Sequence, residues 1–86
     1  MELDCGIRKE RIDTWLDDEL RLERGCGDAW VFRFEKAECQ VETAALESRP
    51  LGTIELERTK VVVDGDDAAV DEFMRLFTLR FVSAGG

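Results

Sequence analysis

The 86-residue sequence contains no histidine, tyrosine or asparagine, and its only proline is Pro50. Without histidine, it has no side chain that ordinarily titrates near neutral pH and no Ser-His or Cys-His nucleophile system. A glycine-rich phosphate loop between a strand and a helix is also missing. We therefore expect a protein that is not an enzyme.

Long apolar runs and basic clusters are absent as well. The longest apolar run without alanine is Val61-Val62-Val63, whereas a membrane-spanning helix needs about twenty such residues. No basic segment followed by an apolar stretch opens the sequence, so we expect no signal peptide. The 20 acidic residues outnumber the 12 basic ones, and the net charge of −8 repels phosphate groups. The sequence predicts a soluble cytoplasmic protein with no nucleic-acid partner and no membrane partner.

The three cysteines are Cys5, Cys26 and Cys39, an odd number at wide spacing. No Cys-x-x-Cys pair is present, so a three-thiolate metal site lacks the usual spacing. We expect free thiols in a reducing cytosol. Nine arginines, three lysines and a single glutamine make the composition resemble that of thermophile proteins.

Two segments have the apolar spacing of helices. In residues 7–19 and the residue after them, Ile12, Trp15, Leu16 and Leu20 form one stripe. Residues 67–77 form the clearer helix, whose stripe consists of Val70, Phe73, Met74 and Phe77. Asp66 is the expected N-cap of this second helix.

Strand patterns fill most of the remaining sequence. Residues 29–36 alternate cleanly, with Trp30, Phe32 and Phe34 on one face. Residues 38–46 also alternate, although 37–48 contains good helix formers, and we favour a strand paired with 29–36. Residues 53–63 are predicted as one long strand in which the apolar side chains change from even positions (Ile54, Leu56) to odd ones (Val61, Val63), which indicates a bulge or bend near 58–60. A last strand is predicted over 78–82.

These elements predict a single α+β domain spanning residues 1–86. Its expected architecture is a two-layer sandwich with an antiparallel-rich sheet of four to five strands and two helices on one face. The predicted order of elements is α-β-β-β-α-β. The helices should cover the face that carries Trp30, Phe32 and Phe34.

One hypothesis for function comes from a group of carboxylates around the start of the second helix. Hard cations such as Ca²⁺ and Mg²⁺ prefer oxygen ligands. The spacing does not match an EF-hand, and the alternative is an ordinary helix start with an acidic first turn. A second acidic group (Asp13, Asp17, Asp18 and Glu19) joins the first only if the two helices lie side by side. The hypothesis is a weak divalent-cation binding module without catalysis, with the candidate ligands Asp64, Asp66, Asp67, Asp71 and Glu72.

A second hypothesis comes from the tail Ser83-Ala84-Gly85-Gly86. It resembles the end of the ubiquitin-like sulfur carriers, such as the molybdopterin-synthase small subunit and the thiamine sulfur carrier. The resemblance covers only these four residues. It implies that the last carboxylate is adenylated and then converted to a thiocarboxylate or an isopeptide. The carriers place a helix between two hairpins, so the resemblance fits this sequence only if 37–48 is helical.

A third hypothesis is a protein–protein interaction module. Trp15 or Trp30 is then an exposed anchor at an interface, or an edge strand over 39–46 pairs with a partner or a second copy. The sequence does not distinguish these alternatives, and it leaves the oligomeric state open.

Overall fold

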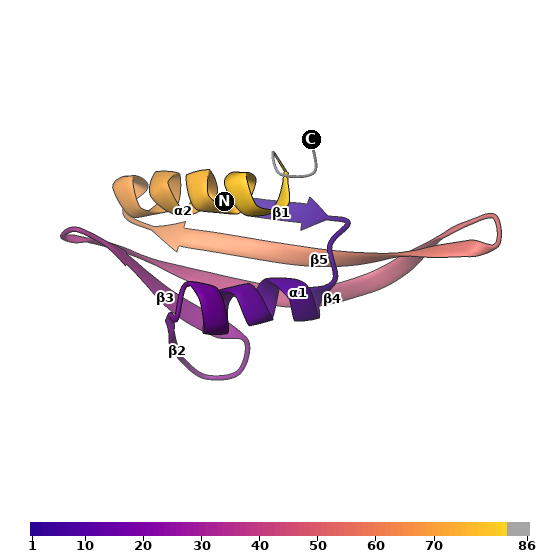
Figure 1. The fold of residues 1–86 in the computed structure, drawn as a ribbon, viewed down its shortest axis with the longest axis horizontal. Helices are drawn as coiled ribbons and strands as arrows, with labels where there is room; N and C mark the ends of the chain where they lie inside the picture. Colours follow the sequence, from indigo (N-terminus) through magenta and orange to yellow (C-terminus); the bar gives the residue numbers. More distant parts are fainter. Residues whose placement is uncertain (83–86) are drawn as a thin grey trace.

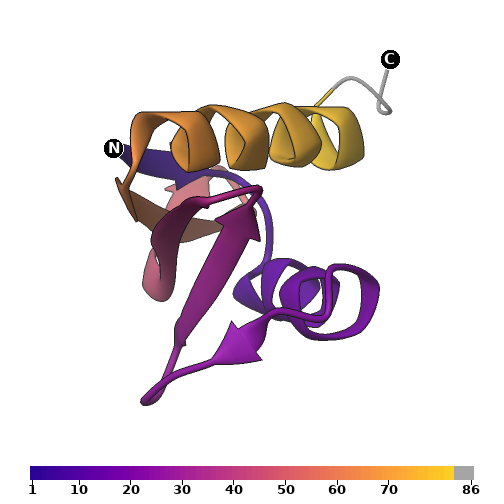
Figure 2. The ribbon, with the colours of Figure 1, turned by 90° about the vertical axis from the view of Figure 1, so that its left-hand side faces the viewer.

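The computed structural model describes residues 1–82 of the chain. Its elements are β1 (Glu2–Cys5), α1 (Lys9–Thr14), the π-helical turn η1 (Trp15–Glu19), β2 (Glu23–Arg24), β3 (Ala29–Phe34), β4 (Ala37–Leu51), β5 (Ile54–Gly65) and α2 (Asp67–Phe81). The five strands form one antiparallel sheet in the order β1-β5-β4-β3-β2. Figure 2 shows α2 lying across these strands. The predicted fold class, an α+β sandwich with helices on one sheet face, is confirmed.

The core lies between the sheet and the two helical segments. Phe73 of α2 is at its centre, with ring centroids 5.6 Å from Trp15 and 5.5 Å from Phe32. Alternation along β3, β4 and β5 sends one side chain in two toward the helices. The buried apolar residues are Ile12, Trp15, Leu16, Trp30, Phe32, Cys39, Val41, Val61, Val63, Ala69, Phe73 and Phe77. The other face of the sheet is not covered by any helix of residues 1–82, and we call it the open face.

The β4–β5 hairpin extends well beyond the helices (Figure 1). Its register slips between Leu46 and Arg49, where β4 has one residue more than β5. The bulge therefore lies on β4, not near residues 58–60 of β5 as predicted. Ile54 and Leu56 are 64% and 45% exposed. These two side chains lie on the open face, whereas Val61 and Val63 lie in the core. Their even and odd positions therefore differ without a bulge in β5.

Residues 38–46 are strand and pair with β3, as favoured, but β4 continues to Leu51. The strand predicted over 78–82 is wrong, because α2 continues to Phe81. That ring extends the helical stripe and lies 5.2 Å from Trp15. The short strand β1 was not predicted, because its partners are residues 59–62 at the far end of the chain.

The structure contradicts two features of the interaction-module hypothesis, the exposed tryptophan and the edge strand over 39–46. Trp15 and Trp30 are both buried, so neither is an exposed anchor. The segment 39–46 belongs to β4, which lies inside the sheet: it pairs with β5 throughout this segment and with β3 as far as Glu42, and the edge strands are β1 and β2. No helix within residues 1–82 combines the length and apolar character required to cross a membrane.

Candidate functional site

The five predicted cation ligands lie along the end of β5 and the first turns of α2. Asp64 is exposed on β5 opposite Gln40, and Asp67 is the first residue of α2. Asp66 occupies the N-cap position, but its Oδ2 accepts a 3.0 Å hydrogen bond from the backbone N–H of Glu38. This bond ties the start of α2 to the start of β4.

The remaining two predicted ligands are on α2. Asp71 is exposed, whereas Glu72 accepts two hydrogen bonds from Arg75, at 2.8 and 2.6 Å. The guanidinium of Arg75 lowers the pKa of Glu72. Among residues 1–82, no three acidic or cysteine side chains are grouped in a way that could hold a metal ion. The cation site therefore stays a prediction.

Three members of the second acidic group, Asp13, Asp17 and Glu19, hold α1 and η1 in place through hydrogen bonds and ion pairs. Asp13 accepts a 2.7 Å hydrogen bond from the hydroxyl of Thr43 and pairs with Lys9 at 2.5 Å. Asp17 accepts a 2.8 Å bond from the indole of Trp30. Glu19 pairs with Arg80 of α2 at 3.3 Å. These contacts join α1 and η1 to the sheet and to α2.

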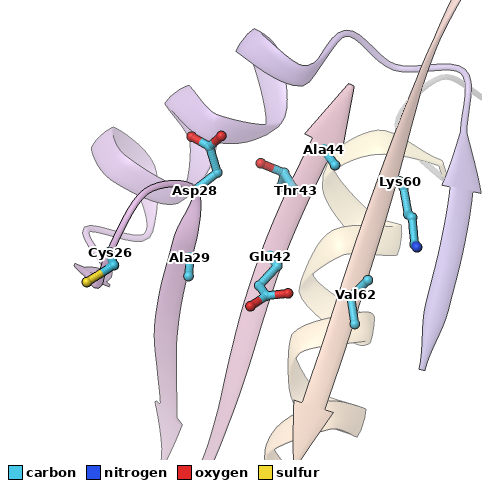
Figure 3. A pocket seen from close by; sticks show the side chains of 8 residues that line it. All are labelled: Cys26, Asp28, Ala29, Glu42, Thr43, Ala44, Lys60 and Val62. Carbon is cyan, nitrogen blue, oxygen red and sulfur yellow. The ribbon is translucent and has the colours of Figure 1, made fainter. Parts of the chain in front are cut away.

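A hollow of about 270 Å³ lies over the middle of the sheet, beside the loop before β3 (Figure 3). At its centre Glu42 of β4 lies between Ala29 of β3 and Val62 of β5, its partners in the strand register. The residues that line the hollow are Cys26, Asp28, Ala29, Glu42, Thr43, Ala44, Lys60 and Val62.

The charges around this hollow are mostly neutralised by ion pairs. Lys60 lies 3.2 Å from Glu2. Asp28 lies 3.2 Å from Lys9 and 3.1 Å from Arg24. The hydrogen bond from Lys9 lowers the pKa of Asp28.

Three basic residues of the open face are paired with carboxylates. Besides Lys60, Arg58 pairs with Asp4, and Arg33 lies 3.0 Å from Glu23 and 3.1 Å from Glu38. Glu42, by contrast, has no ion-pair partner among the described residues. No feature of the sequence marked Glu42, because its surroundings depend on the register of three strands.

The cysteines are free thiols at separate places, as expected. Burial raises the pKa of the Cys5 and Cys39 thiols, which keeps both protonated near neutral pH. Cys26 is exposed at the rim of the hollow. The carboxylates of Asp4 near Cys5 and of Asp66 near Cys39 raise the pKa of these thiols further, so they do not activate them as nucleophiles.

The predicted reactive tail, residues 83–86, lies outside the described residues. The last turn of α2 leads to it and carries two exposed apolar side chains. Leu79 is 52% exposed and Val82, the C-cap, is 61% exposed. Both residues lie a few positions before the tail in sequence.

Comparison with known proteins gives one match. A family model described as "Archaeal MoaD-like protein" matches residues 6–86, which is nearly the whole chain and includes the tail. No curated protein and no solved structure matches.

Proposed function

The chain belongs to the archaeal MoaD-like family, and from this membership we propose that it is a sulfur carrier that uses Gly85-Gly86. In this role it has no catalytic activity of its own and works through a protein partner. The observation that carries the proposal is the family match, which runs through the tail. The lack of histidine in the sequence agrees with a carrier served by a separate enzyme.

The proposed chemistry takes place at the carboxylate of Gly86. The carboxylate attacks the α-phosphorus of ATP, which forms an acyl adenylate and releases pyrophosphate. Hydrosulfide then attacks the carbonyl carbon, and AMP leaves with the bonding electron pair. The product is a thiocarboxylate in which one sulfur replaces one oxygen. Glycine at positions 85 and 86 has no Cβ, so the tail suits a narrow channel in an activating enzyme.

The order and direction of the strands do not support the sulfur-carrier proposal. The sheet is antiparallel throughout, and β4 occupies the stretch where a carrier has its helix between two hairpins. The helices of residues 1–82 instead precede β2 and follow β5. The proposal therefore rests on the family match and on the Gly-Gly sequence.

The end of α2 gives the proposal a docking surface. Leu79 and Val82 expose apolar surface at the end of α2, just before the tail in sequence, and we expect an activating enzyme to bury this surface when it binds the tail. Exposed apolar side chains are common on any protein surface. Their role is therefore tested by comparison with Leu56, a similarly exposed leucine on the distant hairpin.

The test is ATP–pyrophosphate exchange with the cognate activating enzyme. We expect exchange with the native protein, none after deletion of Gly86, and reduced exchange with Leu79→Glu. The matched variant Leu56→Glu should exchange at the native rate, because Leu56 lies on the β4–β5 hairpin and not on the last turn of α2. Absence of exchange with the native protein would refute the carrier function. Equal rates for the two leucine variants would refute only the docking surface.

A further inference from the structure

On the open face of the sheet, the carboxylate of Glu42 has no ion-pair partner among the described residues and is surrounded by apolar side chains. Glu42 is exposed, and its register partners Ala29 and Val62 are half-buried. Ala44, two residues farther along β4, completes the floor of the hollow. A carboxylate in these surroundings gains little by attracting the cations of its own chain, because they already have partners.

The lining of the hollow suits a single long basic side chain. The hollow measures about 270 Å³, and it combines a carboxylate with apolar side chains. Long basic side chains lay their aliphatic stems on apolar surface and keep the charged head at a polar group. Val62 and Ala44 offer such a surface beside the Glu42 carboxylate.

We propose that the hollow receives an arginine side chain from an extended segment of a protein partner. Its guanidinium binds the Glu42 carboxylate with two parallel hydrogen bonds, and its stem lies on Val62 and Ala44. Lys60 does not oppose this, because its ammonium group is paired with Glu2 at 3.2 Å. A second copy is the less suitable occupant, because it brings another charge of −8 to the surface.

This docking surface is independent of the sulfur-carrier proposal. It lies on the face of the sheet opposite α2, whose end leads to the tail. Loss of sulfur transfer would leave the arginine site standing, and loss of the arginine site would leave adenylation unchanged. The two proposals can therefore fail separately.

The experiment is an NMR titration of the full chain with two short blocked peptides. One carries a single arginine between two valines, and the other carries citrulline, its neutral isostere, at the same position. We expect saturable amide shifts at Ala29, Glu42, Ala44 and Val62, with a Kd roughly two- to five-fold lower for the arginine peptide, as an exposed ion pair gives. The difference between the peptides should shrink as salt is added.

Two variants make the test specific. Glu42→Gln keeps the size and exposure of the side chain, and it should abolish the difference between the peptides. Asp18→Asn removes one exposed carboxylate from the helical layer and should leave the difference unchanged. Equal affinity for both peptides, shifts spread over the whole surface, or an unchanged preference in Glu42→Gln would overturn the proposal. Concentration-dependent shifts at these amides without peptide would overturn it in favour of a second copy.

Discussion

The indole Nε1 of Trp30 donates a 2.8 Å hydrogen bond to Oδ1 of Asp17, thirteen residues earlier in the chain. Trp30 is fully buried on the inner face of β3, and this bond satisfies its one polar atom. Arg24 lies over the indole ring at 4.7 Å and also contacts Asp17 at 3.3 Å. The three side chains therefore fix η1 against the edge of the sheet.

We predict that Asp17→Ala lowers the free energy of unfolding by about 1–3 kcal/mol, because it leaves the indole N–H without its partner. Asp18→Ala makes the same change one residue away, on an exposed side chain. It should alter stability by no more than about 0.5 kcal/mol. Urea unfolding of both variants checks the prediction, and equal losses would contradict it.

Gly65, at the end of β5, has the least room for a Cβ among the described glycines. Its φ is +148°, and a Cβ there would lie 2.5 Å from the Cα of Cys39 and 2.6 Å from the carbonyl oxygen of Glu38. We predict that Gly65→Ala costs about 1–3 kcal/mol through backbone strain and displacement. The control Gly6→Ala has no atom within 4 Å of its Cβ and should be almost neutral. Thermal unfolding distinguishes the two, and a stable Gly65→Ala would show that the strands can separate there.

The pair of Glu72 and Arg75 predicts a pH effect of definite sign. Arg75 lowers the pKa of Glu72 in the folded chain. The pair therefore stabilises the fold at pH values above the ordinary glutamate pKa, and this contribution is lost as the pH falls through the lowered value. In Arg75→Gln the side-chain carboxyl of Glu72 should titrate closer to its ordinary value. Carbon-detected NMR titration measures this, and an unchanged pKa in the variant would contradict the pairing.

A substitution of Phe81 tests whether α2 continues beyond residue 77, where the predicted helix ended. Its ring packs 5.0 Å from Phe77 and 5.2 Å from Trp15. We predict that Phe81→Ala destabilises the fold by about 2 kcal/mol, less than the loss of a fully buried ring. Val82→Ala, at an exposed position, should change stability very little. Equal effects in denaturant unfolding would contradict the packing of the last helical turn.

The periodicity of apolar residues was enough to predict the strand β3 and the helix α2. The alternation at Trp30 and Phe32 and the helical spacing at Phe73 and Phe77 both describe side chains that are buried in the structure. These patterns arise because one face of each element must leave water. They were sufficient for the fold class, with two helices on one face of an antiparallel sheet.

Residues 78–82 were predicted as a strand because of their residue types, but α2 continues through them to Phe81. Thr78, Phe81 and Val82 are residue types that favour strands, yet Phe81 also lies four residues after Phe77 and continues its stripe. Tertiary packing against Trp15 settles the segment as helix. The strand β1 had no comparable local signal, because it is stabilised by residues more than fifty positions away.

The open-face site could be predicted only in part. Alternation in β4 already placed Glu42 on the face opposite Val41, which is buried. The sequence does not contain the register that sets Glu42 between Ala29 and Val62, nor the ion pair that occupies Lys60. Both depend on contacts between strands that are far apart in the chain.

The carrier function is tested most directly by intact-mass spectrometry of the protein after incubation with ATP, sulfide and the cognate activating enzyme. The account predicts a mass increase equal to the exchange of one oxygen for one sulfur, located at Gly86 by fragmentation. The variant without Gly86 should keep its original mass under the same conditions. An unchanged mass of the native protein, with active enzyme and ATP confirmed present, would contradict the proposed sulfur-carrier function.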